Sequence, residues 1–214
     1  MNEPKTILWI DGCIRGRELS RSYALAQAAL EELQADKSLQ VDHLDLMQQD
    51  LRPLYGDSFW ARQAQEEAGN WEAPMFRLAR QFAAADGLLI AAPYWEYSFP
   101  ALLKCYLEQV SVAGITFRYT PQGVQGLCQA KRMLFCTTRG GIATGEAGEL
   151  EQGGRYLKAL CLMYGVPEME MVAAEGLDID GADVAGKVAQ ACQQARQAAQ
   201  RLRKALKEET SDCK

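Results

Sequence analysis

Residues 87–104 read Gly-Leu-Leu-Ile-Ala-Ala-Pro-Tyr-Trp-Glu-Tyr-Ser-Phe-Pro-Ala-Leu-Leu-Lys, and this stretch decides the fold. Its first six residues form an unbroken apolar run, which is typical of a strand that is covered on both faces. From Ala101 to Val112 apolar residues recur at helical spacing. An open α/β sheet keeps its ligand where a buried strand ends in such a loop at a helix start. The stretch therefore predicts that a flat aromatic ligand binds at the loop.

The composition is that of an ordinary soluble globular chain. The 214 residues are 48% hydrophobic and 24% charged, which suits one α/β domain spanning residues 1–214. The net charge of -5 disfavours nucleic acid as a partner, because phosphate binding needs a basic face. The sequence shows neither an apolar run near the roughly 20 residues that cross a bilayer nor a signal-peptide pattern at its start. We therefore expect a cytoplasmic protein with no membrane partner.

Cysteine and histidine usage limits the chemistry that side chains can perform. The seven cysteines are widely spaced and include no Cys-x-x-Cys pair, so zinc ribbons, redox pairs and common iron–sulfur sites lack their ligands. His43 is the only histidine, which argues against Ser-His-Asp and Cys-His catalysis and against a multi-histidine metal site. We expect no metal site, and an organic cofactor would have to supply any hard chemistry.

The first predicted strand, Lys5–Ile10, leads into a glycine-containing loop and then into a helix predicted from Ser20 to Ala35. Unpaired N–H groups at a helix start bind anions, and nearby hydroxyl and guanidinium groups add donors. The candidate phosphate ligands are Ser20, Ser22, Arg15 and Arg17. The alternative is that Ser20 only caps the helix and the arginines are only solvated. The loop matches neither the P-loop spacing nor the dinucleotide-binding glycine spacing.

The remaining elements complete an alternating pattern. We predict further strands at 39–46, 87–92, 131–138 and 167–174 and helices within 58–85 (divided near 69–74), 101–112, 148–164 and 181–207. His43 falls in the alternating strand at 39–46, which suits a sheet edge. Residues 113–127 predict a small hairpin over a site, with two exposed rings, and residues 208–214 are expected to fray. Five strands alternating with helices predict a parallel sheet with helices on both faces. In the order 2-1-3-4-5, the loops after strands one, three and four lie together.

Several of these segments resemble one known family. Pro93–Ser98, Gly114–Thr120 and Thr138–Ile142 are similar to the FMN-dependent NADH-azoreductases and NAD(P)H:quinone oxidoreductases. The likeness covers nearly the whole chain and is most specific in the Phe-Arg-Tyr-Thr and Arg-Gly-Gly segments. The resemblance implies a flavodoxin-like three-layer sandwich and a homodimer that holds FMN near its interface. It also implies a ping-pong transfer of two electrons from NADH or NADPH to quinones or azo compounds, in which flavin N5 carries the hydride and no side chain is catalytic.

The resemblance assigns roles to individual residues as well. Ser20 and Ser22 match the phosphate loop, and Cys13 lies near a position that is often serine in the family. Phe117 and Tyr119 would line the substrate pocket, with Tyr119 covering the flavin face. The residues expected around the isoalloxazine ring are Pro93, Tyr94, Trp95, Glu96, Tyr97, Thr138, Arg139, Gly140 and Gly141.

The chain also departs from the family pattern. Glu96 stands where the family usually has asparagine. A carboxylate near the flavin would disfavour its anionic reduced form unless the side chain points away or is protonated. The phosphate loop is one residue longer than in well-known azoreductases and carries Arg15 and Arg17, which leaves the donor preference and azo activity open.

Two other functions stay open from the sequence. A flavodoxin-like electron carrier would bind FMN in a similar way, although flavodoxins usually lack the Phe-Arg-Tyr-Thr hairpin. A cofactor-free binding protein on the same fold is the third alternative, because a fold does not fix a function.

Overall fold

A five-stranded parallel sheet forms the centre of the computed structural model, which describes residues 4–143 and 145–208. Its strands are β1 (Lys5–Asp11), β2 (Leu39–Asp45), β3 (Gly87–Ala91), β6 (Arg132–Thr138) and β7 (Glu168–Ala174). Their order is β2-β1-β3-β6-β7, and every neighbouring pair is parallel. The predicted order 2-1-3-4-5 is the same arrangement, because two hairpin strands take the numbers four and five.

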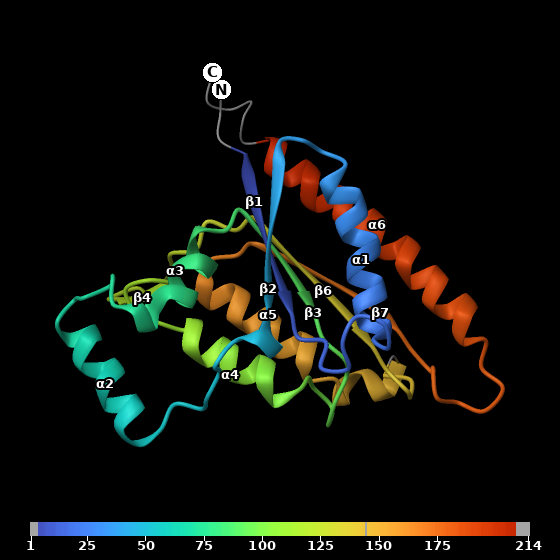
Figure 1. Ribbon diagram of the computed structural model, residues 1–214, viewed down its shortest axis with the longest axis horizontal. Helices are drawn as coiled ribbons and strands as arrows, with labels where there is room; N and C mark the ends of the chain where they lie inside the picture. The colour runs from blue at the N-terminus through green and yellow to red at the C-terminus, as the bar shows by residue number, and fades with distance from the viewer. Residues whose placement is uncertain (1–3, 144, 209–214) are drawn as a thin grey trace.

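Helices cover both faces of this sheet (Figure 1). They are α1 (Arg21–Gln34) and α6 (Val184–Glu208) on one face, and α3 (Arg77–Ala84), α4 (Ala101–Val110) and α5 (Gly153–Tyr164) on the other. In β1, Ile7 and Trp9 belong to the core under α1 and α6, whereas Leu8 and Ile10 belong to the opposite core. Alternate residues of one strand therefore fill two cores, which explains why the central strands are unbroken apolar runs.

Helix α2 (Gly56–Glu67) lies outside these layers and buries none of its residues. It projects from the body at the left of Figure 1. Arg62 holds it to α4 by donating from Nη1 to the carbonyl oxygen of Glu108 at 2.9 Å and from Nη2 to that of Ser111. The rings of Phe59 and Trp60 are exposed and belong to no core of this chain among the residues that the structure describes.

A hairpin of β4 (Phe117–Thr120) and β5 (Gly123–Gly126) follows α4, as predicted. Phe117, which we expected to be exposed, is buried, because β4 turns this ring inward while Arg118 and Tyr119 face solvent. Gly126 fits directly against the backbone at Gly165, where an added Cβ would lie 2.0 Å from the amide nitrogen. The hairpin is therefore closely docked at the end of α5.

The predicted element boundaries differ from the observed ones at three helix starts. A 3-10 helix (Gly145–Leu150) precedes α5, which begins only at Gly153 because Glu151 caps it. Helix α2 begins at Gly56, and 3-10 helices cover Leu46–Gln48 and Pro74–Phe76. Helix α6 begins at Val184, after Asp183 accepts the amide of Gly186 at 2.9 Å. Glu208 is still helical, and residues 209–214, where we predicted fraying, lie outside the described residues.

Candidate functional site

The loops after β1, β3, β6 and β7 enclose a solvent-open cavity of about 200 Å³ at the carboxyl edge of the sheet. Three of these loops are those that the sequence predicted to converge. The lining residues are Arg15, Leu19, Ser20, Arg21, Ser22, Pro93, Tyr94, Trp95, Thr138, Arg139, Gly140, Leu177 and Asp178. Sequence reasoning missed Leu19, Arg21, Leu177 and Asp178, which are the neighbours of the loops it identified.

The N-terminus of α1 faces this cavity. Ser20 is the N-cap, and its hydroxyl oxygen accepts the amide of Tyr23 at 3.2 Å. Ser22 is fully buried, and its hydroxyl lies 2.8 Å from the hydroxyl of Thr138, so it joins the start of α1 to the end of β6. Within residues 4–143 and 145–208, the amides of Arg21 and Ser22 have no acceptor. Unpaired amides at a helix start are the donors that an anion needs.

Cys13 and Asp11 support the phosphate loop from below. The Asp11 carboxylate is buried and accepts the amide of Cys13 at 3.0 Å, while the amide of Gly12 donates to the carbonyl of Ala91 at 2.8 Å. Burial raises the pKa of the Cys13 thiol well above its usual value, although a hydrogen bond from Ser20 opposes this shift. Cys13 is therefore a neutral packed thiol beneath the loop.

His43 completes this support from the edge strand. Its ring stacks on Trp9 with centroids 3.9 Å apart, and its Nε2 lies 3.4 Å from Oδ2 of Asp11. The predicted edge position is confirmed, since β2 is the outer strand. The ring is nonetheless half-buried, because Trp9 covers one of its faces. The position of Asp11, directly after the apolar run Lys5–Ile10, is the feature of the sequence from which this contact with His43 could have been predicted.

The aromatic loop after β3 ends in a tight turn. Trp95 and Ser98 exchange two backbone hydrogen bonds of 3.1 and 2.7 Å, and between them Glu96 and Tyr97 have φ values of 50° and 64°. Both φ values lie in the left-handed region, which glycine or asparagine adopts far more easily than other residues. The amide of Gln152 donates to the carbonyl of Tyr97 at 2.8 Å and secures the turn. Residues held in this way are typical of ligand sites.

The side chain of Glu96 points into solvent. It is exposed and makes no hydrogen bond or ion pair with any residue that the structure describes. The rings of Tyr94 and Tyr97 meet edge to face, with centroids 6.5 Å apart. Burial raises the pKa of Tyr94, so its hydroxyl is neutral. The loop thus turns rings toward one another and its carboxylate toward water.

Backbone hydrogen bonds hold the loop Arg139–Gly141: the Arg139 amide donates to the carbonyl of Ala174 at 2.9 Å, and all three carbonyls of the loop accept amides. The oxygens of Arg139, Gly140 and Gly141 accept the amides of residues 177, 178 and 176 at 3.1, 3.0 and 2.8 Å. In the described part of the chain, the amides of Gly140 and Gly141 donate to nothing. A Cβ added at Gly140 would lie 2.3 Å from Oδ2 of Asp178, so a side chain there would displace that exposed carboxylate. The two free amides are donors for the polar edge of a ligand.

Arginines give the rim of the cavity a positive character. Arg21 Nη1 lies 3.0 Å from Oδ1 of Asp178 and joins the start of α1 to the loop after β7. Arg15 lines the cavity, Arg17 lies two residues further along the same loop, and both are exposed. Neither forms an ion pair among residues 4–143 and 145–208. The rim therefore suits an anionic ligand.

Residues 5–199 match the family described as having the flavodoxin-like fold. The chain belongs to this flavodoxin-like family. It is 32% identical over 195 residues to FMN-dependent NADH:quinone oxidoreductase 2 from Clostridium acetobutylicum, covering 90% of this chain and 97% of the relative. It is 36% identical over 184 residues to FMN-dependent NADH:quinone oxidoreductase from Bacillus pumilus, covering 79% and 86%.

Solved structures place this flavodoxin-like chain in the same group. An azoreductase from Bacillus anthracis str. Sterne is 25% identical, with a TM-score of 0.81 and coverage of 91% of this chain and 98% of that one. An FMN-dependent NADH-azoreductase from Bacillus anthracis str. Ames Ancestor, solved in complex with FMN, is 22% identical with a TM-score of 0.82, covering 92% and 99%. The second likeness supports the fold alone. The predicted family of quinone oxidoreductases and azoreductases is confirmed.

Some predicted residues of this flavodoxin-like chain do not line the cavity. Arg17, Glu96, Tyr97 and Gly141 are exposed and lie within two residues of residues that do line it, and Cys13 lies beneath the loop. Phe117 and Tyr119 lie elsewhere, because α4 starts at the cavity and its ten residues carry the chain about 15 Å away before the hairpin begins. Within one chain, the structure does not bring these two rings to the cavity.

Among residues 4–143 and 145–208, no helix has both the length and the apolar character that a membrane crossing requires. In the same residues, no three His, Cys, Asp or Glu side chains are grouped so that they could hold a metal ion.

Proposed function

We propose that this protein is an FMN-dependent NAD(P)H oxidoreductase that reduces quinone-like or azo acceptors by two-electron, ping-pong transfer. The observation that carries the proposal is the pairing of two groups of unused backbone amides across one cavity. One group, at Arg21 and Ser22, is suited to a phosphate, and the other, at Gly140 and Gly141, is suited to a polar ring edge. The names of the similar proteins support the same reading.

The residues around the cavity fit FMN. At the phosphate end, the amides of Arg21 and Ser22 would hold the dianion, with Ser20, Arg15 and Arg17 adding donors. The residues that would surround the ring are Pro93, Tyr94, Trp95, Tyr97, Thr138, Gly140 and Gly141. The Glu96 carboxylate is directed into solvent, so the charge that the sequence placed beside the flavin does not oppose binding.

When bound, FMN supplies the hydride chemistry, and the work of the protein is to bind, orient and shield. The free amides of Gly140 and Gly141 would fix the polar edge of the ring. The rings of Tyr94 and Trp95 would cover its apolar surface and exclude water. The open side of the cavity would admit the nicotinamide of NADH or NADPH and then the acceptor. None of these steps requires a side chain to act as a nucleophile.

We also propose that residues 1–214 form one domain and that two copies form a homodimer. The exposed rings of Phe59 and Trp60 on α2, and of Tyr119 on the hairpin, are surfaces that a second copy would cover. Phe117 and Tyr119 are far from the cavity of their own chain, so a substrate role for them requires the cavity of the other copy. Light scattering gives the mass in solution, and a monomer at micromolar concentration would remove this part of the proposal.

The first test is the spectrum of the purified protein and its titration with FMN. We expect flavin absorbance, or quenching of FMN fluorescence on addition to the apoprotein. A colourless protein that leaves added FMN unchanged would refute the proposal and favour a cofactor-free binding protein. Oxidation of NADH or NADPH with a soluble quinone then separates an enzyme from an electron carrier, because a carrier would bind FMN without steady-state turnover. The NADH and NADPH rates, measured together, give the donor preference.

A further inference from the structure

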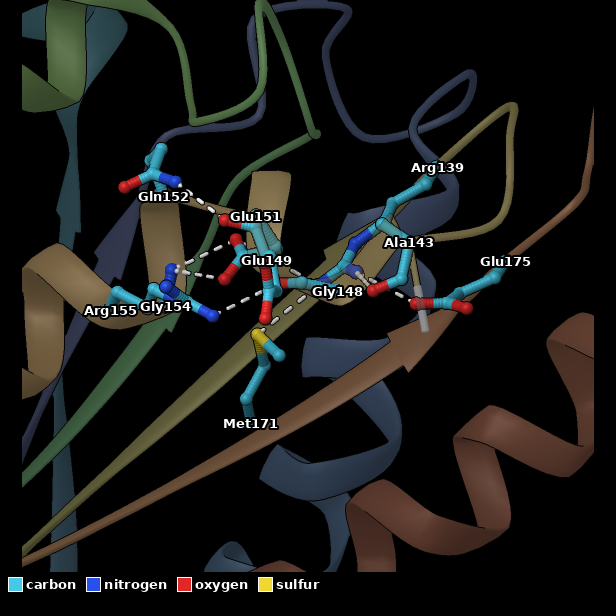
Figure 2. Close-up of polar contacts among 10 residues, drawn as sticks. All are labelled: Arg139, Ala143, Gly148, Glu149, Glu151, Gln152, Gly154, Arg155, Met171 and Glu175. Atoms are coloured by element: carbon cyan, nitrogen blue, oxygen red, sulfur yellow. Dashed lines mark hydrogen bonds and ion pairs between the residues drawn. The ribbon is translucent and has the colours of Figure 1, made fainter. Parts of the chain in front are cut away.

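The side chain of Arg139 is almost fully buried. Figure 2 shows its polar contacts. Its Nη1 donates to Oε1 of Glu175 at 2.7 Å and to the carbonyl of Ala143 at 3.4 Å. Its Nη2 donates to the sulfur of Met171 at 3.3 Å and lies 3.9 Å from Oε1 of Glu151. One guanidinium thus contacts β7, the loop after it, the 139–143 loop and Glu151, which lies two residues before α5. These contacts engage both terminal nitrogens of the guanidinium with protein groups.

Both glutamates fix parts of the cavity wall. The Glu151 carboxylate, itself 7% exposed, accepts the amide of Gly154 at 2.9 and 3.1 Å and so caps α5. The next residue, Gln152, donates its amide to the carbonyl of Tyr97 and so anchors the aromatic turn. Glu175 lies in the loop whose following amides hold the carbonyls of residues 139–141. Each carboxylate therefore connects Arg139 to one of the two loops, residues 93–98 and 139–141, that border the proposed site of the flavin ring.

Arg139 also contacts the aromatic wall directly. Its Cζ lies 5.0 Å from the centroid of the Tyr94 ring, which is a cation–π distance. Its backbone belongs to the opposite wall, where Gly140 and Gly141 present their free amides. Its Nε has no acceptor in the part of the chain that the structure describes. Arg139 therefore belongs to one wall of the proposed ring site, the loop that carries Gly140 and Gly141, and contacts the other wall at Tyr94.

We propose that Arg139, paired with Glu151 and Glu175, is the positioning residue that sets the spacing and orientation of the two walls of the ring site. The proposal rests on the proposed function, in which FMN occupies the cavity. Arg139 acts through the Tyr94 ring and through the amides of Gly140 and Gly141. It differs from the sequence-based expectation, in which Arg139 was a cofactor ligand. A planar guanidinium can hold four directions at once, which a lysine ammonium on a flexible stem cannot reproduce.

The chain contains a matched control for this cluster. Arg132 starts the same strand, β6, and its guanidinium also bonds two glutamates of β7, Glu168 and Glu170. It lies at the amino end of the strand, so it is remote from the cavity at the carboxyl end. Arg132→Met removes a comparable ion-pair set without touching the ring site.

The test compares Arg139→Met, Arg139→Lys and Arg132→Met for their affinity toward FMN and riboflavin. Riboflavin lacks the phosphate, so it reports on the ring site alone. We expect Arg139→Met and Arg139→Lys to weaken both flavins by about tenfold and to change the residual flavin fluorescence at saturation. Arg132→Met should lose thermal stability while keeping both affinities. Equal affinities and equal saturating fluorescence in a folded Arg139→Met would overturn the proposal.

A second variant separates positioning from stability. Arg139→Met leaves the buried Glu151 and the partly buried Glu175 without their cation, so Arg139→Met/Glu175→Gln should recover part of the lost stability. If Arg139 positions the walls, affinity for both flavins stays weak in this double variant. Full recovery of affinity along with stability would show a purely structural role and overturn the proposal.

If Arg139→Met does not fold, Glu175→Gln replaces it, with about threefold weaker binding of both flavins expected; unchanged binding overturns the proposal. If the wild-type protein binds neither flavin, the proposed function fails, and the positioning role fails with it. Wild-type binding together with unaffected variants refutes the positioning role alone.

Discussion

Replacing Glu96 by asparagine is expected to stabilise the protein. Glu96 has a φ of 50° in the turn between Trp95 and Ser98. A left-handed conformation costs an ordinary L-residue roughly 1–2 kcal/mol, and asparagine bears much less of this cost. Since the Glu96 side chain is exposed and bonds no described residue, little is lost in exchange. We expect the free energy of unfolding to rise by about 0.5–1 kcal/mol.

For a chain of this length, such a gain raises Tm by about 1–4 °C. The measurement is thermal and urea unfolding of the apoprotein, followed by circular dichroism. Two controls isolate the backbone effect. Glu96→Gln removes the charge and keeps the strain, and Glu18→Asn makes the same replacement in an exposed loop at a residue without positive φ. Both should stay within about 0.5 kcal/mol of wild type.

The reasoning would be refuted by an unchanged or lowered Tm in Glu96→Asn while both controls match the wild type. A gain of equal size in Glu96→Gln would also refute it, because the benefit would then come from loss of charge. Glu96→Gly should gain less than Glu96→Asn, because glycine loses more conformational freedom on folding.

Three further predictions concern stability and reactivity. Gly126→Ala should destabilise the protein by about 1–3 kcal/mol or more, because the added Cβ would lie 2.0 Å from the Gly165 amide nitrogen. Urea unfolding measures this loss, and a variant as stable as the wild type would contradict the close packing of the hairpin against the end of α5. Burial raises the pKa of Cys128 and Cys161 to about 12, so both should resist a thiol reagent at pH 8 until the protein unfolds; rapid labelling of the folded protein would count against burial. Hydrogen bonds from Lys207 and Ser38 lower the pKa of Asp36 below 3.8. Its stabilising effect should be complete above about pH 4 and fade as pH falls, so Asp36→Asn should destabilise at pH 7 and matter less in acid; a constant difference would contradict this.

The sequence was most informative where one signal is local. The runs Lys5–Ile10 and Gly87–Ala92 are strands because both of their faces are buried, and this shows directly as unbroken hydrophobicity. The ligand loops follow from topology, since the carboxyl ends of neighbouring parallel strands lie at one edge. These two arguments were enough to predict the sheet and most of the residues around the cavity.

The polar cluster beneath the cavity could not be predicted in the same way. Glu151 and Glu175 lie 12 and 36 positions from Arg139, respectively, and in sequence they resemble solvated residues of a helix and a loop. Only the packed structure brings the three charges together, and the break before α5 follows from the same cap at Glu151. The location of Phe117 was also missed, because a single ring in a four-residue strand has no periodicity to indicate its face.

The cavity draws its walls from nearly the whole length of the polypeptide, from Arg15 at one end to Asp178 at the other. If FMN occupies this cavity as proposed, the chain must emerge almost completely during synthesis before any flavin can be retained. Binding of the cofactor would then indicate that all five strands of the sheet, including β7, have been assembled. Chains that stop before residue 174 would fold part of the sheet and stay colourless, so the yellow colour of a preparation would serve as a gauge of intact, finished molecules.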